Sequence, residues 1–73
     1  MKRYALWEEW GNIVGARVSE HATPLKWMQN VLVVGVDDSS WLTELRMMEG
    51  EILEKIRSHK PDLKIDAIRW TLK

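Results

Sequence analysis

The side chains that could carry chemistry in this sequence are few, and their spacing gives them no partners for it. His21 and His59 are the only imidazoles, and neither has a second metal-type ligand at helical spacing beside it. Ser39 and Ser40 lack the strand-to-helix turn of a nucleophile elbow, and helix capping explains them better. The lack of Cys excludes a disulfide, a thiolate zinc site and a cysteine nucleophile. We therefore expect no catalytic residues, no cofactor and no metal, and the chain is not predicted to be an enzyme.

Glycines and carboxylates, which bind phosphate or transfer protons in many enzymes, have structural explanations here. Gly11 and Gly15 fall inside a predicted helix and do not follow a strand, so they do not form a phosphate-binding loop. Asp37 and Asp38 precede another predicted helix, where the positive end of the helix dipole favours acidic groups. These residues are therefore predicted to have structural roles and no catalytic or phosphate-binding role.

Length, charge and hydropathy restrict the class of protein. Seventy-three residues allow one small domain, residues 1–73, and an apolar content of 45% with five Trp can build its core. Eleven basic and eleven acidic residues cancel, so no net field draws the chain toward nucleic acid or anionic lipid. The longest apolar stretch, Val31 to Val36, is too short to cross a bilayer, and no signal-peptide core follows the first Met. We expect a soluble cytoplasmic domain without membrane contact.

Apolar periodicity predicts one helix from about Arg3 to His21. Its apolar stripe consists of Leu6, Trp7, Trp10, Ile13, Val14 and Val18. Gly11 and Gly15 lie on one flank of the stripe, which indicates close approach of another backbone; the alternative is that one glycine marks a break in the helix. Pro24 ends the segment because the residue before a proline is displaced from helical geometry.

Two strands, Leu25 to Met28 and Val31 to Val36, are predicted to form a hairpin through Gln29 and Asn30. Asn30 is expected to supply the left-handed conformation of the turn. This turn places Leu25 opposite Val34. One face then carries Leu25, Trp27, Leu32, Val34 and Val36, and the other carries Lys26, Met28, Val31, Val33 and Gly35. The first face is predicted to meet the core because it holds the larger residues and no charge.

A second helix is predicted to start at Asp37 to Ser40, with acidic groups near its positive end and a hydroxyl to cap free N–H groups. Its apolar arc stays in phase from Trp41 to Ile56 across Gly50. We therefore predict one unbroken helix to about Ser58.

A third strand is predicted from Lys64 to Leu72, after Pro61 and Asp62 end the preceding helical pattern. Its inward residues are Ile68, Trp70 and Leu72, and its outward residues are Ala67, Arg69 and Thr71. With the usual right-handed crossover, the second and third strands are parallel. The predicted fold class is α+β, helix-strand-strand-helix-strand, with a three-stranded sheet and two helices on one face. The face left open presents Lys26, Met28, Val31, Val33, Arg69 and Thr71.

Charged residues interrupt both apolar arcs. Arg17 and His21 fall within the arc of the first helix, and Glu49 falls within that of the second. Arg17 can extend from the core edge while His21 lies at a frayed helix end. Alternatively, Glu49 pairs with Arg17 or His21 across the helix interface.

Four of the five tryptophans divide into two groups, and Trp7 lies at the edge of the first helix's apolar stripe. Trp10 and Trp41 are predicted core anchors, and Trp41 is expected to be largely buried. The hairpin register turns Trp27 and Trp70 inward, which favours core packing over a base-stacking platform on the sheet surface.

Two segments resemble, in order, the signatures of the DciA family. Trp10-Gly-Asn-Ile-Val-Gly15 followed by His21-Ala-Thr-Pro24 is similar to W-x-x-I-V-G…H-T-x-P. The segment from Leu32 to Leu45 is similar to L-x-V-x-V-x-x-S-x-W-x-x-E-L. Residues 68–70 resemble the family's closing strand loosely, and Asn30 stands where the family often has Gly.

The resemblance implies a KH-like module and a bacterial helper that recruits or loads the replicative DNA helicase without hydrolysing ATP itself. Family members are also associated with DNA binding, so single-stranded or forked DNA is a further implied partner. This chain has zero net charge and lacks the G-x-x-G loop of RNA-binding KH domains, which indicates weak or local contact with nucleic acid.

The open face of the sheet is the predicted location of the binding residues. The residues expected to contact a protein partner are Met28, Val31, Val33 and Thr71. Those expected to contact nucleic acid are Lys26 and Arg69, with Lys2, Arg3 and Lys73 near the termini in reserve. Two other functions stay open from the sequence: a single-stranded nucleic-acid-binding module without a helicase partner, and a small homo-oligomeric scaffold that uses the open face.

Overall fold

A computed structural model describes residues 4–73, which form four helices and three strands. The elements are α1 (Tyr4–Val14), α2 (Ala16–His21), β1 (Ala22–Met28), β2 (Val31–Val36), α3 (Ser39–Met47), α4 (Glu49–His59) and β3 (Ala67–Leu72). The predicted α+β class with a three-stranded sheet is confirmed, and the arrangement is compatible with a KH-like fold.

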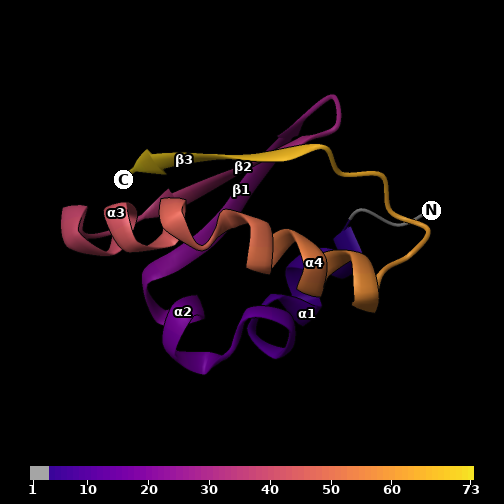
Figure 1. Cartoon of the computed structure of the whole chain (residues 1–73), viewed down its shortest axis with the longest axis horizontal. Coiled ribbons are helices and arrows are strands. Elements are labelled where there is room, and N and C mark those ends of the chain that lie inside the picture. The colour runs from indigo at the N-terminus through magenta and orange to yellow at the C-terminus, as the bar shows by residue number, and fades with distance from the viewer. Residues whose placement is uncertain (1–3) are drawn as a thin grey trace.

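The sheet is mixed and has the strand order β1-β2-β3 (Figure 1). β1 and β2 are antiparallel, whereas β2 and β3 are parallel. The predicted parallel pairing is confirmed, and the chain travels through α3 and α4 before it returns in the same direction. β2 is therefore paired on both sides.

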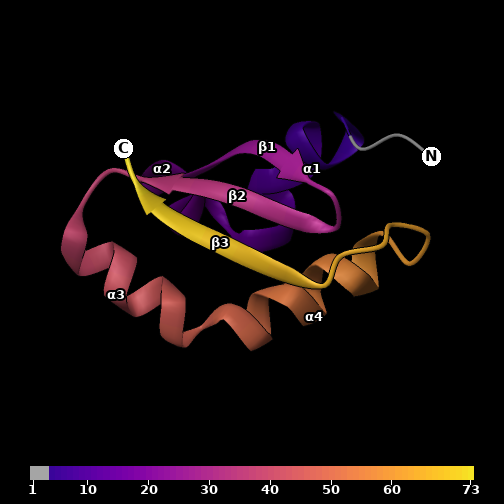
Figure 2. The same cartoon turned by 90° about the horizontal axis from the view of Figure 1, so that it is seen from above.

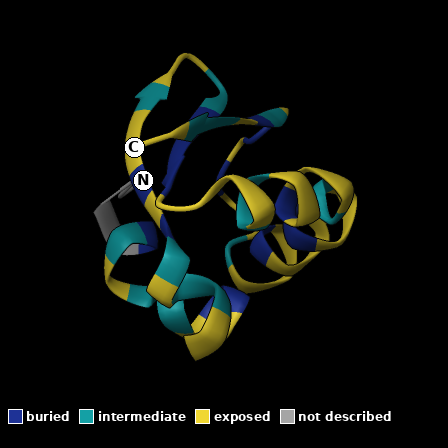
Figure 3. Cartoon of the chain, turned by 90° about the vertical axis from the view of Figure 1, so that its left-hand side faces the viewer, coloured by how far each residue is buried: buried dark blue, intermediate teal, exposed yellow. Residues whose placement is uncertain are grey.

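The described helices lie on one side of the sheet. α3 and α4 contact β3, while α1 and α2 contact β1. Figure 2 shows the three strands in front of α1 and α2, with α3 and α4 curving alongside β3. Between these layers lies the core, whose fully buried side chains include Leu6, Leu32, Val34, Val36, Leu45, Ile52 and Ile56. Figure 3 shows the buried segments where helices and strands face one another.

The first predicted helix is divided at Gly15, so the alternative of a break at one glycine is correct. Gly15 has a φ of 96°, a left-handed value that side chains disfavour. Gly11 lies opposite α2, where a methyl group in place of its hydrogen would sit 3.5 Å from the Ser19 hydroxyl. The close approach of another backbone that was predicted for both glycines is not observed, because Gly11 meets only the Ser19 side chain at an ordinary contact distance and nothing lies within 4 Å of a methyl group at Gly15.

The prediction of one unbroken second helix is wrong. The chain bends at Met48, whose N–H donates to both Glu44 O (3.2 Å) and Leu45 O (3.0 Å). Gly50, the residue across which continuity was predicted, lies within α4. The bend lets α3 and α4 follow the curved sheet while Leu45 and Ile52 both remain in the core. Periodicity stays in phase through such a bend and therefore does not reveal it.

The start of α3 is capped as predicted, but by a different group. The Asp38 carboxylate accepts hydrogen bonds from Ser40 N (3.0 Å) and Trp41 N (3.2 Å). A carboxylate therefore provides the cap that had been assigned to a hydroxyl, at the end of the helix where its charge is favoured.

The hairpin differs from its prediction at both ends. Gln29 adopts the left-handed conformation (φ 58°) that was assigned to Asn30. A bulge between Pro24 and Lys26 places Pro24, not Leu25, opposite Val34. Leu25 was predicted to face the core, but it leaves the pairing and is 44% exposed. Proline lacks the N–H of a regular ladder, so a bulge beside it is physically reasonable.

The closing segment forms a shorter strand than predicted. β3 begins at Ala67, and its last inward position, Leu72, is 52% exposed instead of buried. Leu63 and Ile65, which precede β3, are buried and complete the core from a loop.

The two predicted Trp anchors behave differently. Trp10 is buried (4% exposed), and its Nε1 donates to Ala22 O at 2.8 Å. Trp41 is only half-buried, because it packs at the edge of the core. Trp10 is therefore confirmed as a core anchor, while Trp41 packs against the core and is less deeply buried than Trp10.

Candidate functional site

The candidate site is the side of the sheet that none of the described helices covers. We call it the open sheet face. Its residues are Thr23, Leu25, Lys26, Met28, Val31, Val33, Gly35, Ala67, Arg69, Thr71 and Lys73. The strand register determines this membership, because directly paired residues project to the same side of a sheet. The face observed includes every residue predicted for it.

Three side chains form a row across the middle of the open sheet face. Lys26 of β1 pairs with Val33 of β2, which in turn pairs with Arg69 of β3. Lys26 and Arg69 are exposed, so the two cations stand on either side of an apolar centre. The structure thus brings together the two residues that were predicted as the main cations of the site.

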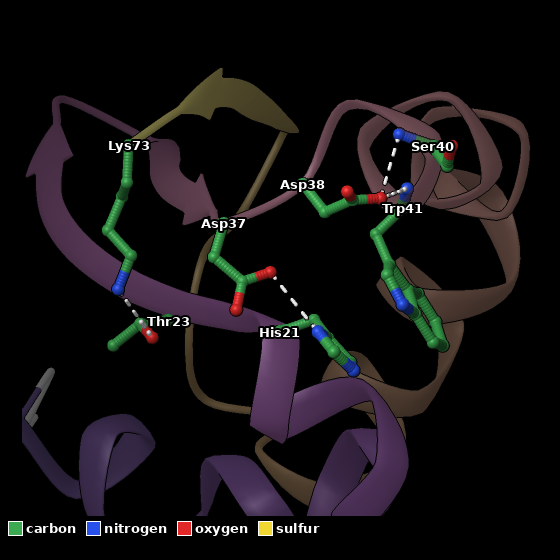
Figure 4. A network of polar contacts seen from close by, with 7 residues as sticks. All are labelled: His21, Thr23, Asp37, Asp38, Ser40, Trp41 and Lys73. Atoms are coloured by element: carbon green, nitrogen blue, oxygen red, sulfur yellow. Dashed lines mark hydrogen bonds and ion pairs between the residues drawn. The ribbon is translucent and has the colours of Figure 1, made fainter.

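Gly35 allows a third cation to lie on this face. A methyl group at Gly35 would be 2.6 Å from Cγ of Lys73 and 3.0 Å from Cδ1 of Leu25. These two side chains therefore lie across β2 at a point where any other residue would displace them. The Lys73 ammonium reaches β1, where it donates to the Thr23 hydroxyl at 3.4 Å (Figure 4).

The charges of the open sheet face all have one sign. Lys26, Arg69 and Lys73 are its charged residues, and no Asp or Glu belongs to it. The chain has a formal net charge of zero, so the compensating acids lie elsewhere, on helices and loops. Folding has therefore produced a local positive surface that the overall charge does not indicate.

The apolar part of the face is concentrated near the hairpin. Met28 is 50% exposed, and a hollow beside it is lined by Met28, Gln29, Val31 and Arg69. Val31 and Thr71 are half-buried. Val33, which was predicted to be an exposed contact residue, is only 6% exposed because its neighbours cover it. Met28 and Leu25 are the apolar side chains that a partner can reach most easily.

Two predicted cations lie outside the described residues, and one exposed apolar residue of the open sheet face was not predicted. Lys2 and Arg3 are outside the described residues, so their predicted role stays a prediction. Leu25 was missed because its exposure depends on the bulge. Pro24 inside a strand was the sequence signal that could have indicated it.

The aromatic residues of the strands face away from the open sheet face. Trp27 pairs with Leu32 and Trp70 pairs with Val34, both of which belong to the buried core. Trp27 and Trp70 pack against that core, as predicted. The face defined above consequently contains no aromatic side chain on which a base could stack.

Glu49 contacts β3 instead of the first helices. Its carboxylate accepts hydrogen bonds from the backbone N–H of Ile68 (3.1 Å) and from Trp70 Nε1 (3.2 Å). The predicted pairing with Arg17 or His21 is therefore wrong. The bend at Met48 immediately precedes Glu49 and places its carboxylate beside the strand.

His21 lies in a second cluster, at the end of α2. Its Nδ1 is 3.1 Å from Asp37 Oδ1, and its ring stacks on that of Trp41 with 4.5 Å between ring centres (Figure 4). A shallow hollow nearby is lined by Arg17, Ser40, Trp41 and Glu44. These contacts hold α2 against the start of α3 and explain why His21 is not at a frayed end.

Within residues 4–73, no group of three or more His, Cys, Asp or Glu side chains could hold a metal ion. No helix in the same range is long and apolar enough to cross a membrane.

The fold and this surface define a small α+β module whose sheet is covered by helices on one side and is basic and partly apolar on the other. Residues 1–70 match the model of the family described as Dna[CI] antecedent, DciA. The chain belongs to the DciA family, which is associated with DNA replication.

Similar proteins carry an uninformative name. A UPF0232 protein of Mycobacterium ulcerans is 40% identical over 48 residues, which cover 66% of this chain and 26% of that protein. The UPF0232 protein RHA1_ro03670 of Rhodococcus jostii is 34% identical over 62 residues, or 85% of this chain and 33% of that protein. The chain thus spans between a quarter and a third of the length of these two relatives.

Proposed function

We propose that this chain is a non-enzymatic adaptor module that recruits or loads the replicative DNA helicase during bacterial DNA replication. Membership of the DciA family supports the proposal, since the family model matches residues 1–70. The structural observation that supports a binding role is the open sheet face. This face combines exposed apolar side chains with cations, and no other described element covers it.

The open sheet face is the proposed contact surface for the helicase. Protein interfaces commonly combine an apolar centre with a polar rim. Met28 and Val31 supply apolar area beside a hollow, while Lys26 and Arg69 lie at the flanks. Thr71 and the largely covered Val33 complete the centre.

Met28→Glu tests the proposal with a single exposed side chain. Purified replicative helicase from the bacterium that encodes the chain should bind this variant about tenfold more weakly, because a carboxylate would replace apolar area at the contact. Calorimetry or surface-based binding measures the affinity, and thermal melting shows whether the fold is intact.

Met47→Glu is the matched control. Met47 is 76% exposed on α3, away from the open sheet face, and the substitution changes the net charge equally. It should leave helicase binding unchanged. Equal binding of both variants and the parent would remove the open sheet face from the proposal, and failure of the parent to bind would remove the helicase.

A second candidate function is a single-stranded nucleic-acid-binding module without a helicase partner. The placement of Lys26, Arg69 and Lys73 on one face without an acid favours it. Neutralised phosphates release counterions, so binding of an oligo-dT strand should weaken steeply with salt. Lys26→Glu with Arg69→Glu should reduce the slope of log K against log salt by about 0.7 for each phosphate that is no longer neutralised.

A further inference from the structure

The chemistry of the open sheet face indicates which kind of partner segment fits it. Its centre, along β2, is apolar. Val33 and Gly35 are buried under neighbouring side chains, so Val31, Met28 and Leu25 offer the apolar surface that a partner can reach. Exposed cations flank this centre, with Lys26 on β1 and Arg69 on β3. A ligand that matches it must offer apolar groups in the middle and negative groups on both sides.

The width of the face corresponds to one helix. Lys26 and Arg69 are separated by two strand spacings, or about 10 Å between backbones. An α-helix with its side chains is about 10–12 Å across. A helix lying along β2 would therefore place its apolar stripe on Val31, Met28 and Leu25 and its flanks within reach of both cations.

Two other occupants match the face less well. Single-stranded nucleic acid is held by cations together with aromatic platforms, and Trp27 and Trp70 are turned to the core side. A second copy of this chain, docked through the same face, would oppose Lys26, Arg69 and Lys73 to identical cations. Like charges facing each other across an interface are unfavourable.

We infer that the open sheet face binds an acidic amphipathic helix of the partner protein, with its apolar stripe over β2 and its carboxylates at Lys26, Arg69 and Lys73. The inference rests on the proposed function only for the identity of the protein that supplies the helix. The recognition itself depends on the charges and the register described above.

A pair of synthetic peptides tests the recognition without the helicase. Both peptides are helical and carry one leucine stripe, which is flanked by glutamates in the first and by lysines in the second. The acidic peptide should bind at least about tenfold more tightly than the basic peptide. Its addition should shift the NMR amide signals of Lys26, Val33 and Arg69 more than those of α3 and α4.

Charge-reversal variants locate the effect. Lys26→Glu with Arg69→Glu should abolish the preference for the acidic peptide. Arg46→Glu with Lys55→Glu changes the net charge by the same amount on exposed positions of α3 and α4 and should preserve it. If the acidic peptide binds no better than the basic one, or if the signals that shift lie outside the open sheet face, the inference is wrong.

The intact helicase then separates this inference from the proposed function. A photoreactive residue at position 28 should crosslink to a helical helicase segment with acids on both flanks of an apolar stripe. If the helicase binds but crosslinks through a segment without acidic residues, the inference is wrong and the proposed function is retained. Helicase that does not bind overturns the proposed function, and the peptide result alone then decides the inference.

An oligo-dT strand provides the competing outcome. If the strand binds with signal shifts at Lys26 and Arg69 and displaces the acidic peptide completely at equal concentration, the face is a nucleic-acid site and the inference is overturned. Retention of the peptide under these conditions supports the helix as the occupant.

Discussion

Glu49 joins two parts of the chain that are distant in sequence. Its half-buried carboxylate accepts a hydrogen bond from the backbone N–H of Ile68, on the side of β3 that does not pair with β2. It accepts a second hydrogen bond from the side-chain Nε1 of Trp70. Hydrogen bonds to charged groups are stronger than neutral ones, and donors left without an acceptor are costly. A single side chain therefore helps to attach the helical layer to the sheet.

Glu49→Ala should lower the free energy of unfolding by about 2 kcal/mol, because both donors lose their acceptor. Urea unfolding of the purified chain measures the change. Glu51→Ala is the control, since Glu51 is an exposed acid in the same first turn of α4. An equal loss for both variants would show that only the helix dipole is involved.

Trp10 and Trp41 should differ in their contribution to stability. Trp10→Ala removes a buried ring and its hydrogen bond to Ala22 O, and should cost about 3–5 kcal/mol. Trp41→Ala removes a half-buried ring that stacks on His21, and should cost less. Thermal melting of the two variants decides the order, and a larger effect at Trp41 would contradict this description of the core.

At the scale of elements, the two helical segments bend for different reasons. The division between α1 and α2 depends on Gly15, whose left-handed φ of 96° favours glycine. The bend between α3 and α4 occurs at Met48, whose φ of −95° any residue can adopt. The first bend is therefore encoded by a residue type, whereas the second follows from packing against the curved sheet.

Substituting two glycines by alanine should have effects of opposite sign. Nothing lies within 4 Å of a methyl group at Gly15 or Gly50, so contacts do not decide either outcome. Gly15→Ala should destabilise by about 1–2 kcal/mol because of the left-handed conformation. Gly50→Ala should stabilise α4 by about 0.5–1 kcal/mol through helix propensity. Unfolding midpoints measure both, and the same sign for both would contradict the assigned conformations.

At the scale of the whole molecule, stability should be graded from the centre of the sheet outward. β2 is paired on both sides and contributes Leu32, Val34 and Val36, which have no exposed surface. α2 has six residues and none of them is buried. The centre of the open sheet face therefore lies on the strand that is paired on both sides, while its cations lie on the flanking strands and at Lys73.

Amide hydrogen exchange should follow this gradient. Protection should be highest for β2 and lowest for α2 and for residues 60–66. Exchange measured by NMR on the native chain tests the order residue by residue. Protection of α2 equal to that of β2 would show that the chain opens as one unit.

Local patterns were sufficient to predict the order of elements, the parallel pairing of β2 and β3, and most residues of the open sheet face, Leu25 excepted. Strand alternation and handedness of crossover are short-range or general constraints. Lys26, Val33 and Arg69 could therefore be assigned to one face from the sequence, although they come from three different strands.

Contacts between segments that are distant in sequence determined the features that local patterns did not predict. The bend at Met48, the acceptor role of Glu49 and the passage of Lys73 over Gly35 each join residues about 20 or more positions apart, or depend on such contacts. The local apolar pattern of the sequence would be the same with or without these long-range contacts. The exposure of Leu25 depends on whether Pro24 or Leu25 pairs with Val34, and only the assembled sheet selects one register. The sequence by itself thus determined which side of each element is apolar. The tertiary structure determined which charged group contacts which partner, because these contacts join residues that are distant in sequence and close in space.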